Sequence, residues 1–351
     1  MQERGIELPV DVVEEPTTDD DVFYNQEMQV NRDISTACLA VLHEEYGGEW
    51  RVCDALAASG VRGLRYRAEV DGLGEVIVND ISSAAVDTMT AAADRNNLGD
   101  TVTVEHRDAN ALLTSEFRSL DFVDIDPFGS PTPYLDSAAR ALRHNTAAGF
   151  TATDLGPLYG SYPKVCRRRY AAAPVKAAFG RYDYAFTPVL SWHEQHYSRV
   201  VGRVEESKQQ CNGMLDDIGF LSFCRSCRWR EYTWVETCPE CGSGVERAGP
   251  LWTGRLGTED IGAAVTAWLE EQGYDAAAEL VQTVADEVTV TTPFYDTHEL
   301  ASTLDVEAPS LDTVIDDLQD QRYTAVPTHF SPHGVKTDAP FAAVQDAVAQ
   351  R

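Results

Sequence analysis

Short apolar runs alternate with longer stretches of helical periodicity between Trp50 and Leu155. Five of these runs predict strands, namely RVCDAL from Arg51, EVIVND from Glu75, TVTVEH from Thr101, LDFVDID from Leu120 and GFTATDL from Gly149. Helices are expected between them, for example SSAAVDTMTAAADRNN, which opens with a serine suited to an N-cap. Because strands that alternate with helices form parallel sheets, the pattern predicts a doubly wound α/β domain.

Two later apolar runs, SRVVGRVEE from Ser198 and GPLWTGRL from Gly249, are expected to be the sixth and seventh strands of this sheet. The segment of about 207–248 then elaborates the connection between them. Helical periodicity resumes after Thr258 and is followed by the extended run AVPTHF and a last helix. We therefore expect a first domain at 1–257 and a smaller C-terminal α/β domain at 258–351.

Acidic residues outnumber basic residues by 57 to 28, which gives a formal net charge of −29. Such self-repulsion is tolerated where salt screens it, since the Debye length falls to about 3 Å at molar ionic strength. We expect a haloarchaeal, cytoplasmic protein, and the alternative is an ordinary acidic protein that avoids nucleic acid. The sequence has no apolar window of about 20 residues and no secretory signal pattern, so neither a membrane nor an obligate protein partner is expected.

The first predicted strand ends in DALAASG, in which Leu56 and Ala58 stand where the methyltransferase pattern D-x-G-x-G-x-G has glycine. An ordinary strand-to-helix turn is the alternative interpretation. The next two strands end near Asp80 and Asp108, which are placed to accept hydrogen bonds from ribose hydroxyls and from an adenine amino group. Each aspartate alone is equally typical of a helix cap. Their position at adjacent strand ends favours a nucleotide-type cofactor site.

The fourth predicted strand ends in DIDPFG, and alternation along the strand puts Asp124 and Asp126 on one face. Asp126 is suited to accept from an exocyclic amine and to orient its lone pair toward a methyl donor. Phe128 offers a face for base stacking, which is worth about 1–3 kcal/mol. The motif is similar to [DNS]-P-P-[YFW] of amino-methyltransferases, whereas a plain helix start at Pro127 is the alternative. Asp154, after the fifth strand, either lines the same pocket or shapes a turn.

A stretch without acidic residues lies between Leu155 and Tyr182, and its basic residues are interleaved with tyrosines. The basic residues are Lys164, Arg167, Arg168, Arg169, Lys176 and Arg181, and the tyrosines are Tyr159, Tyr162 and Tyr170. Basic side chains bind phosphates and aromatic rings stack on bases, so this stretch predicts an RNA-binding surface. A basic helix face paired with acidic neighbours is the alternative.

Four cysteines follow the spacing C-x2-C-x10-C-x2-C, at Cys224, Cys227, Cys238 and Cys241. This spacing is typical of a four-thiolate zinc site, and a closed site of that kind is structural because it leaves no open coordination position. We expect a Zn²⁺ ion that braces a protruding hairpin.

Several motifs together resemble the tRNA (guanine-26-N2)-dimethyltransferase family: FYNQEMQVNRD, DALAASGVRG, VNDIS, DIDPFGSP, TATD, GPLWTG and THFSPHGVKTDAP. The resemblance implies a class I (Rossmann-like) methyltransferase fold with a zinc-ribbon-like insertion and a smaller C-terminal α/β domain. It also implies transfer of two methyl groups from S-adenosyl-L-methionine to the N2 amine of a guanine in tRNA. The C-terminal domain would help to hold the tRNA.

The resemblance also implies roles for individual residues. Arg32 and Arg62 would bind the methionine carboxylate of the cofactor, Asp80 the ribose, and Asp108 with Ala109 the adenine. Asp126 and Phe128 would orient and stack the guanine, with Asp124 in support. Two other functions stay open: a class I amino-methyltransferase acting on a different RNA or DNA base, and a zinc-bearing RNA-binding protein without cofactor.

Overall fold

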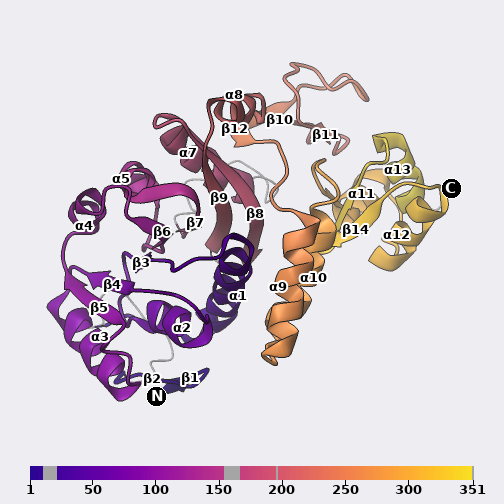
Figure 1. Ribbon diagram of the computed structural model, residues 1–351. Coiled ribbons are helices and arrows are strands. Elements are labelled where there is room, and N and C mark those ends of the chain that lie inside the picture. The colour runs from indigo at the N-terminus through magenta and orange to yellow at the C-terminus, as the bar shows by residue number, and fades with distance from the viewer. Residues whose placement is uncertain (11–21, 154–166, 195–196, 350–351) are drawn as a thin grey trace.

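The computed structural model of the chain describes residues 1–10, 22–153, 167–194 and 197–349. Its largest unit is a seven-stranded sheet of order β5-β4-β3-β6-β7-β9-β8 (Figure 1). The first five strands of this order are parallel, and the last two run antiparallel to their neighbours. Their bounds are β3 (Val52–Asp54), β4 (Val76–Asp80), β5 (Val102–His106), β6 (Leu120–Ile125), β7 (Leu142–Ala152), β8 (Tyr184–Glu194) and β9 (Tyr197–Glu206). The predicted α/β fold and its five parallel strands are confirmed.

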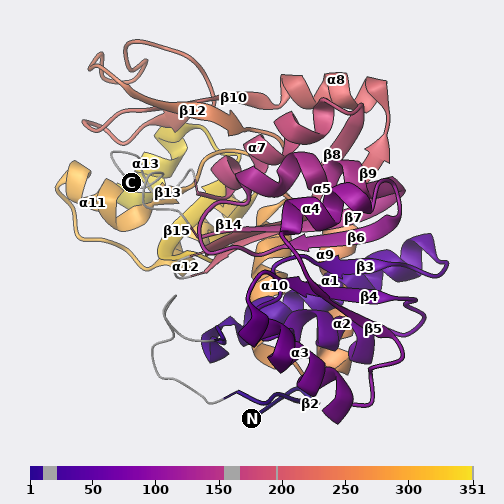
Figure 2. The ribbon, with the colours of Figure 1, turned by 90° about the vertical axis from the view of Figure 1, so that its left-hand side faces the viewer.

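Helices cover both faces of this sheet, and successive residues of a strand point into opposite cores. Phe122 of β6 belongs to one core and its neighbour Val123 to the other, as the period of two in a strand requires. The first core includes residues of α1 (Gln29–Tyr46), α2 (Val61–Glu69) and α3 (Ser83–Arg95). The second includes residues of α4 (Ala109–Ser115), α5 (Leu135–Ala141) and α7 (Arg167–Gly180). Figure 2 shows the sheet between these two helical layers.

The identity of the seventh strand differs from the prediction. GPLWTGRL forms much of β12 (Glu246–Trp252), which belongs to a separate three-stranded sheet, and the seventh strand of the main sheet is β8. The run that forms β8 contains Pro188, which removes a backbone donor and argues against a central strand. The proline is accommodated because β8 lies at the edge of the sheet, with a register shift between Pro188 and Leu190.

The four cysteines lie in the loops between the strands of this separate sheet, which follows α8 (Lys208–Asp216) and has the order β11-β10-β12. It includes β10 (Ile218–Phe223) and β11 (Arg230–Glu231). Cys224, Trp229 and Cys238 share a third core with the C-terminal part of the chain. The expected cysteine-bearing insertion is therefore confirmed, but it is packed against the end of the chain.

The C-terminal part holds a small sheet of order β13-β15-β14 with three helices around it. These elements are β13 (Tyr295–Asp296), α11 (Thr297–Leu304), α12 (Leu311–Asp320), β14 (Ala325–Thr328), β15 (Ser331–Thr337) and α13 (Phe341–Ala349). The two preceding helices, α9 (Glu259–Glu271) and α10 (Asp275–Glu287), share the first core with α1. The division of the chain at residue 258 stays a prediction, since α9 and α10 belong to the core of the main sheet.

At the other end of the chain, the hairpin of β1 (Gln2–Glu3) and β2 (Ile6–Glu7) buries Ile6 and Leu8 in the first core. The short helix η1 (Gln26–Met28) leads into α1, and η2 (Thr132–Tyr134) leads into α5. None of the described helices combines the length and the apolar content needed to cross a bilayer.

The contact of α2 with the sheet depends on a glycine. A Cβ at Gly63 would lie 2.3 Å from Cγ1 of Val78, so Gly63→Ala forces α2 away from β4. We expect this variant to lose about 1–3 kcal/mol of unfolding free energy, measured by denaturant titration. Gly213→Ala is the matched control, because Gly213 is exposed within α8 and its Cβ would meet nothing within 4 Å. The control should gain up to about 1 kcal/mol; equal effects of the two changes would contradict the packing argument.

Candidate active site

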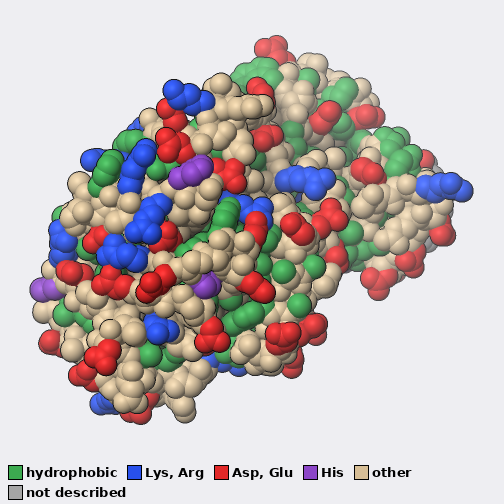
Figure 3. All heavy atoms as spheres, in the orientation of Figure 1, with side chains coloured by type: hydrophobic (Ala, Val, Ile, Leu, Met, Phe, Trp, Pro, Cys, Tyr) green, Lys and Arg blue, Asp and Glu red, His purple; other side chains and the backbone are tan. Residues whose placement is uncertain are grey.

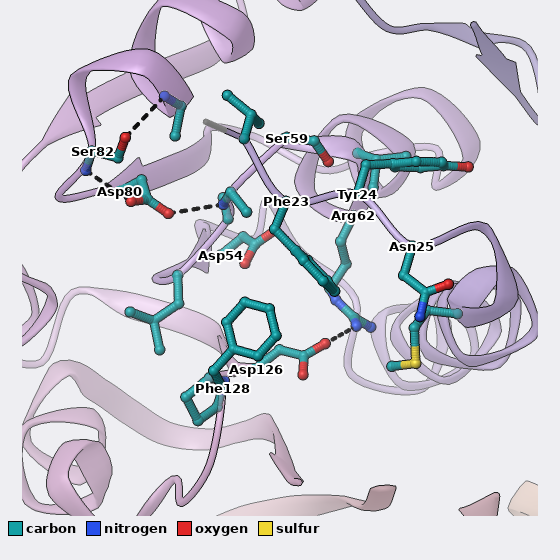
Figure 4. Close-up of a pocket in the computed structure, with 18 of the residues that line it drawn as sticks. Phe23, Tyr24, Asn25, Asp54, Ser59, Arg62, Asp80, Ser82, Asp126 and Phe128 are labelled. Atoms are coloured by element: carbon teal, nitrogen blue, oxygen red, sulfur yellow. Dashed lines mark hydrogen bonds and ion pairs between the residues drawn. The ribbon is translucent and has the colours of Figure 1, made fainter. Parts of the chain in front are cut away.

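A pocket opens at the carboxyl ends of β3, β4 and β6, the edge at which open α/β sheets bind ligands. Its volume is about 530 Å³, which is typical of small-molecule sites. Figure 4 shows side chains from the segment before α1, the β3–α2 turn, the end of β4 and the turn after β6 converging on this space. Five of the residues predicted from the sequence line it: Arg32, Arg62, Asp80, Asp126 and Phe128.

The turn from β3 to α2 keeps a glycine-like backbone although only one glycine is present. Ala58 has φ 47° and Gly60 has φ 77°, both in the left-handed region. A left-handed alanine is strained, and here its N–H donates to Oδ2 of Asp80 at 3.0 Å. The N–H of Ala57 donates to the carbonyl of Asn79 at 2.8 Å. Hydrogen bonds from backbone N–H groups to the end of β4 thus fix the conformation of this turn. The sequence motif alone was equally typical of an ordinary strand-to-helix turn.

Asp54, at the end of β3, lines the pocket although it is almost fully buried. Burial, together with the negative charge of Asp124, raises the pKa of Asp54 to about 7. The positive charge of Arg62 and a hydrogen bond from the N–H of Gly63, at 3.1 Å, act in the opposite direction. Asp54 therefore changes charge near neutral pH.

The structure separates the predicted cofactor aspartates. Asp80 lines the pocket, and its second oxygen accepts from the N–H of Ser82 at 2.9 Å. Asp108 is the N-cap of α4 and accepts from the N–H of Ala111 at 2.9 Å. Neither Asp108 nor the buried Ala109 is among the residues that line the pocket. The helix-cap alternative therefore describes the contacts of Asp108, and its role toward adenine stays a prediction.

Arg32 lines the pocket but is already paired. Its Nε and Nη2 donate to the carboxylate of Glu3, and Nη2 also donates to the carbonyl of Asn25 at 3.0 Å. Burial opposes ionisation of Glu3, yet the hydrogen bonds and charge of Arg32, with help from Tyr24 and Arg65, lower the pKa of Glu3 to about 2. The N-terminal hairpin thus supplies a buried counter-ion that fixes the orientation of Arg32.

Asp124 does not reach the pocket. It is fully buried, accepts from the hydroxyl of Tyr66 at 2.6 Å, and pairs with both terminal nitrogens of Arg199 on β9. Although burial opposes ionisation, the guanidinium groups of Arg199 and Arg62 keep the pKa of Asp124 below its usual range. A Cβ on Gly149 would lie 2.6 Å from Nη2 of Arg199, so glycine on β7 makes room for this pair.

Arg62 connects Asp124 to the pocket. Its Nε lies 4.0 Å from Oδ1 of Asp124, and its Nη2 pairs with Asp126. Two α1 side chains accept the other hydrogen bonds of the guanidinium, Ser35 at 2.8 Å and Asn31 at 2.9 Å. The predicted pair of carboxylates on one face is therefore present, but Asp126 meets the pocket while Asp124 holds Arg62 from behind.

Two phenylalanines lie beside Asp126. The ring of Phe128 is 58% exposed and meets the ring of Phe23 edge to face, with centroids 4.4 Å apart (Figure 4). The turn that carries Phe128 is fixed by Thr153 at the end of β7, whose Oγ1 accepts from the N–H of Gly129 at 2.6 Å. Gly129 has φ 102°, a conformation that favours glycine. An exposed aromatic face thus lies next to a carboxylate at the mouth of the pocket.

Part of the predicted basic RNA surface is used inside the protein. Lys176 is buried with its Nζ 2.6 Å from the ring centroid of Trp252, and burial lowers the pKa of Lys176 to about 7. Arg181 is exposed and pairs with Asp136 at 3.0 Å. Lys164 and Asp154 lie outside the described residues, as do the side chains of the three arginines at the start of α7. Of the two described cations of this stretch, Arg181 therefore has an acidic neighbour, as the alternative expects, and Lys176 is buried; the RNA-binding surface stays a prediction.

The four cysteine sulfurs lie within 4.8 Å of one another. Sγ of Cys224 is 3.5 Å from Sγ of Cys241, and the same distance separates Cys227 from Cys238. Each C-x2-C turn closes with a 2.9 Å backbone bond to the carbonyl of its first cysteine, and the donors, Arg228 and Gly242, have φ 71° and 73°. Four thiolates around one zinc ion would be about 3.8 Å apart, so the arrangement fits a tetrahedral ion.

Sequence reasoning did not assign roles to several of these residues. Asp54, Phe23 and Tyr24 line the pocket, while Glu3 and Arg199 act behind it. Phe23 and Tyr24 belong to the motif FYNQEMQVNRD, one of the motifs that carry the family resemblance, so the sequence did mark this segment as a candidate for the site. Glu3 and Arg199 gave no local signal, because their partners are 29 and 75 residues away in the sequence.

A family model and full-length relatives identify the family of the chain. Residues 9–349 match the family model described as N2,N2-dimethylguanosine tRNA methyltransferase. The tRNA (guanine(26)-N(2))-dimethyltransferase of Methanobrevibacter smithii is 33% identical over 95% of this chain and 92% of its own length. The enzyme of that name from Haloarcula marismortui is also 33% identical, over 94% of both chains.

Among solved structures, Trm1 from Pyrococcus horikoshii in complex with S-adenosyl-L-methionine superposes with a TM-score of 0.83. Its sequence is 29% identical, and the match covers 95% of this chain and 96% of that one. The similarity therefore includes the main sheet, the cysteine-bearing sheet and the C-terminal part.

The titration of Asp54 predicts a pH-dependent stability. Its folded-state pKa of about 7 exceeds the ordinary value of 3.8, so the folded chain binds the proton more tightly than the unfolded chain. The contribution of Asp54 to stability is full below about pH 4 and is lost as pH rises through about 7. Relative to Asp54→Asn, the wild type should lose unfolding free energy between pH 5 and pH 8 in chemical denaturation. A difference that is constant with pH would contradict this assignment.

Proposed function

The chain belongs to the N2,N2-dimethylguanosine tRNA methyltransferase family, and we propose that the pocket at its strand ends is where guanine and methyl donor meet. The protein is a tRNA (guanine(26)-N(2))-dimethyltransferase that uses S-adenosyl-L-methionine. The observation that carries the assignment of the site is the exposed ring of Phe128 beside the Arg62–Asp126 pair, within a pocket lined by Asp80.

On the acceptor side, Asp126 accepts a hydrogen bond from the N2 amine of guanine and turns its lone pair toward the methyl donor. A carboxylate in this position also stabilises the positive charge that grows on nitrogen as the N–C bond forms. The ion pair with Arg62 fixes the carboxylate orientation. The rings of Phe128 and Phe23 bind the extruded base by stacking and edge contacts.

On the donor side, the residues at the pocket fit the methyl donor. S-adenosyl-L-methionine, when bound, supplies an electrophilic methyl group on its sulfonium sulfur. Asp80, whose oxygens already accept from two backbone N–H groups, is placed to accept from ribose hydroxyls as well. Arg62 and Arg32 are the guanidinium groups that would bind a carboxylate there, and Asp124 acts by positioning Arg62.

The high negative charge of the chain is related to the ionic strength of the environment in which the enzyme acts. Figure 3 shows acidic side chains spread over the visible face of the molecule, with basic side chains most frequent on the side of the main sheet. Such a surface repels tRNA at low ionic strength, whereas concentrated salt screens it. A salt-rich haloarchaeal cytoplasm accounts for this charge. The chain is equally similar to the Methanobrevibacter smithii and Haloarcula marismortui enzymes, so its charge is the observation that supports this origin.

The cysteine cluster would hold a structural zinc ion, and the spacing of its sulfurs and its two matched turns support this assignment. Because Cys224 and Cys238 lie in the third core, the ion would stabilise the C-terminal part together with its own sheet. The C-terminal part, residues 258–351, would help to hold the tRNA.

Asp126→Ala should reduce methyl transfer to tRNA by at least about 100-fold, because the acceptor amine loses its hydrogen-bond partner. Binding of S-adenosyl-L-methionine, measured by calorimetry, should fall much less than methyl transfer, and any loss reports the freed Arg62, whose partner Asp126 is. Mass spectrometry of digested tRNA reports the mono- and dimethylated guanosine. Asp136→Ala, at an exposed aspartate paired with Arg181, is the control and should keep full activity. Undiminished turnover of the Asp126 variant would remove this residue from the chemistry.

Replacing Cys224 and Cys227 together by serine should abolish zinc binding, which plasma mass spectrometry of the purified protein measures directly. The wild type should contain one zinc ion per chain. The variant should also unfold at a lower temperature, since structural zinc contributes to folding energy. Cys211→Ser is the control, because Cys211 is a free thiol outside the cluster. Metal-free wild-type protein with unaltered stability would refute the proposed ion.

A further inference from the structure

The cysteine-bearing sheet carries an exposed tryptophan that the methylation site does not use. Trp234 follows β11 and is 58% exposed. The only other described large hydrophobic side chains with comparable exposure are Ile81, Phe117 and Phe128. Phe128 belongs to the methylation site, and Ile81 directly follows Asp80. A large aromatic side chain left in water suggests a binding contact when the protein also holds it in place.

Trp234 is held in place on three sides. The buried hydroxyl of Ser222 donates to the carbonyl of Thr233 at 2.9 Å and accepts from the N–H of Val235 at 3.3 Å, so it fixes the backbone on both sides of Trp234. The ring of Phe220 meets the indole edge to face, with centroids 4.6 Å apart. The guanidinium carbon of Arg247 lies 4.5 Å from the indole centroid. The indole is therefore ordered before any partner binds, which lowers the entropic cost of binding.

The charge of this sheet differs from that of the chain. Residues 218–252 contain four arginines and four glutamates and no aspartate or lysine, so these charges cancel, while the chain carries −29. Arg247 forms no ion pair with any carboxylate of the described residues, and its guanidinium is directed at Trp234. In an acidic protein, a surface of low charge with an unpaired arginine is among the places that a polyanion can approach.

The sheet is also fixed relative to the methylation pocket. Its core is shared with the C-terminal part, and Arg228 pairs with Glu299 of α11 at 3.5 Å. In Figure 2, the loops that extend from β10 and β12 point to the same side as the indigo segment that enters α1. That segment lines the pocket. A nucleic acid with one base in the pocket can therefore meet this sheet at a second point.

We propose that Trp234, with Arg247, forms a platform on which an unstacked base of the tRNA substrate stacks, outside the methylation pocket. Indole stacking on a base is independent of base identity, and Arg247 adds a charge for the adjoining phosphate. The platform rests on the proposed function, because it needs tRNA as the substrate. It gives the cysteine-bearing sheet a direct role in tRNA binding in addition to its structural one.

Trp234→Ala should weaken tRNA binding about 5- to 100-fold in filter binding. It should raise KM for tRNA in proportion, while kcat at saturating tRNA and the affinity for S-adenosyl-L-methionine stay unchanged. Because stacking releases few counter-ions, the slope of log affinity against log salt should not change in this variant. Arg247→Gln should instead reduce that slope by about one. Trp234→Phe should keep most of the affinity.

Phe117→Ala is the matched control. Phe117 is 60% exposed, has the guanidinium of Arg118 5.9 Å from its ring centroid, and precedes β6 at the sheet edge opposite the pocket. It should not alter tRNA affinity. If Trp234→Ala fails to fold, Trp234→Leu keeps an apolar contact with Phe220 while removing the indole face and tests the same point.

The outcomes separate this inference from the proposed function. Wild-type enzyme that methylates tRNA while Trp234→Ala and Trp234→Leu bind tRNA as tightly as wild type would overturn the platform. Wild-type enzyme without activity on tRNA would instead overturn the proposed function. An equal loss of affinity in Phe117→Ala would show that exposed aromatic residues act nonspecifically, and the platform would again be wrong.

Discussion

Arg62 carries a positive charge into the interior, where it pairs with Asp126 and lies 4.0 Å from Asp124. A buried charge is tolerated only with partners around it, and the partners of Arg62, which is on α2, come from α1 and from the end of β6. Asn31 and Ser35 on α1 accept from its nitrogens, and the carboxylates belong to Asp124 on β6 and to Asp126 in the turn after it. Loss of one partner of such a buried pair costs about 3–5 kcal/mol, so α1, α2 and β6 are fixed to one another at the pocket.

The antiparallel hairpin of β8 and β9 extends this constraint beyond the parallel strands. Arg199 on β9 pairs with Asp124, and the backbone N–H of His193 on β8 donates to the imidazole of His329 at 3.0 Å. His329 in turn pairs with Glu287 at the end of α10. One hairpin therefore stabilises the back of the pocket and also contacts the C-terminal part. The position of that part relative to the pocket depends on the same strands as the chemistry.

The limits of sequence prediction follow from the range of each interaction. The five parallel strands, Asp126, Phe128 and the cysteine spacing are local patterns, and the structure has those strands and brings those residues to a pocket or a cluster. The sequence did not predict the edge strand β8. Pro188 is tolerated there because β8 lies at the edge of the sheet, and a strand's place in the sheet is not a local pattern. Asp108 shows the same limit. The sequence predicts its position after a strand, whereas the structure shows that its side chain caps α4. The proposed role of Asp108 toward adenine depends on three-dimensional contacts with the cofactor, which a local sequence pattern does not give.

The hydrogen bond from Ala58 to Asp80 couples the shape of the β3–α2 turn to the carboxylate that is placed for the ribose. A left-handed backbone is strained for alanine, and the hydrogen bond to the carboxylate of Asp80 helps to hold Ala58 in it. The carboxylate that stabilises this backbone is also the one placed for the ribose. In this chain, recognition of the nucleoside and the shape of the loop beneath it therefore vary together, and neither can be altered by substitution at Asp80 without the other.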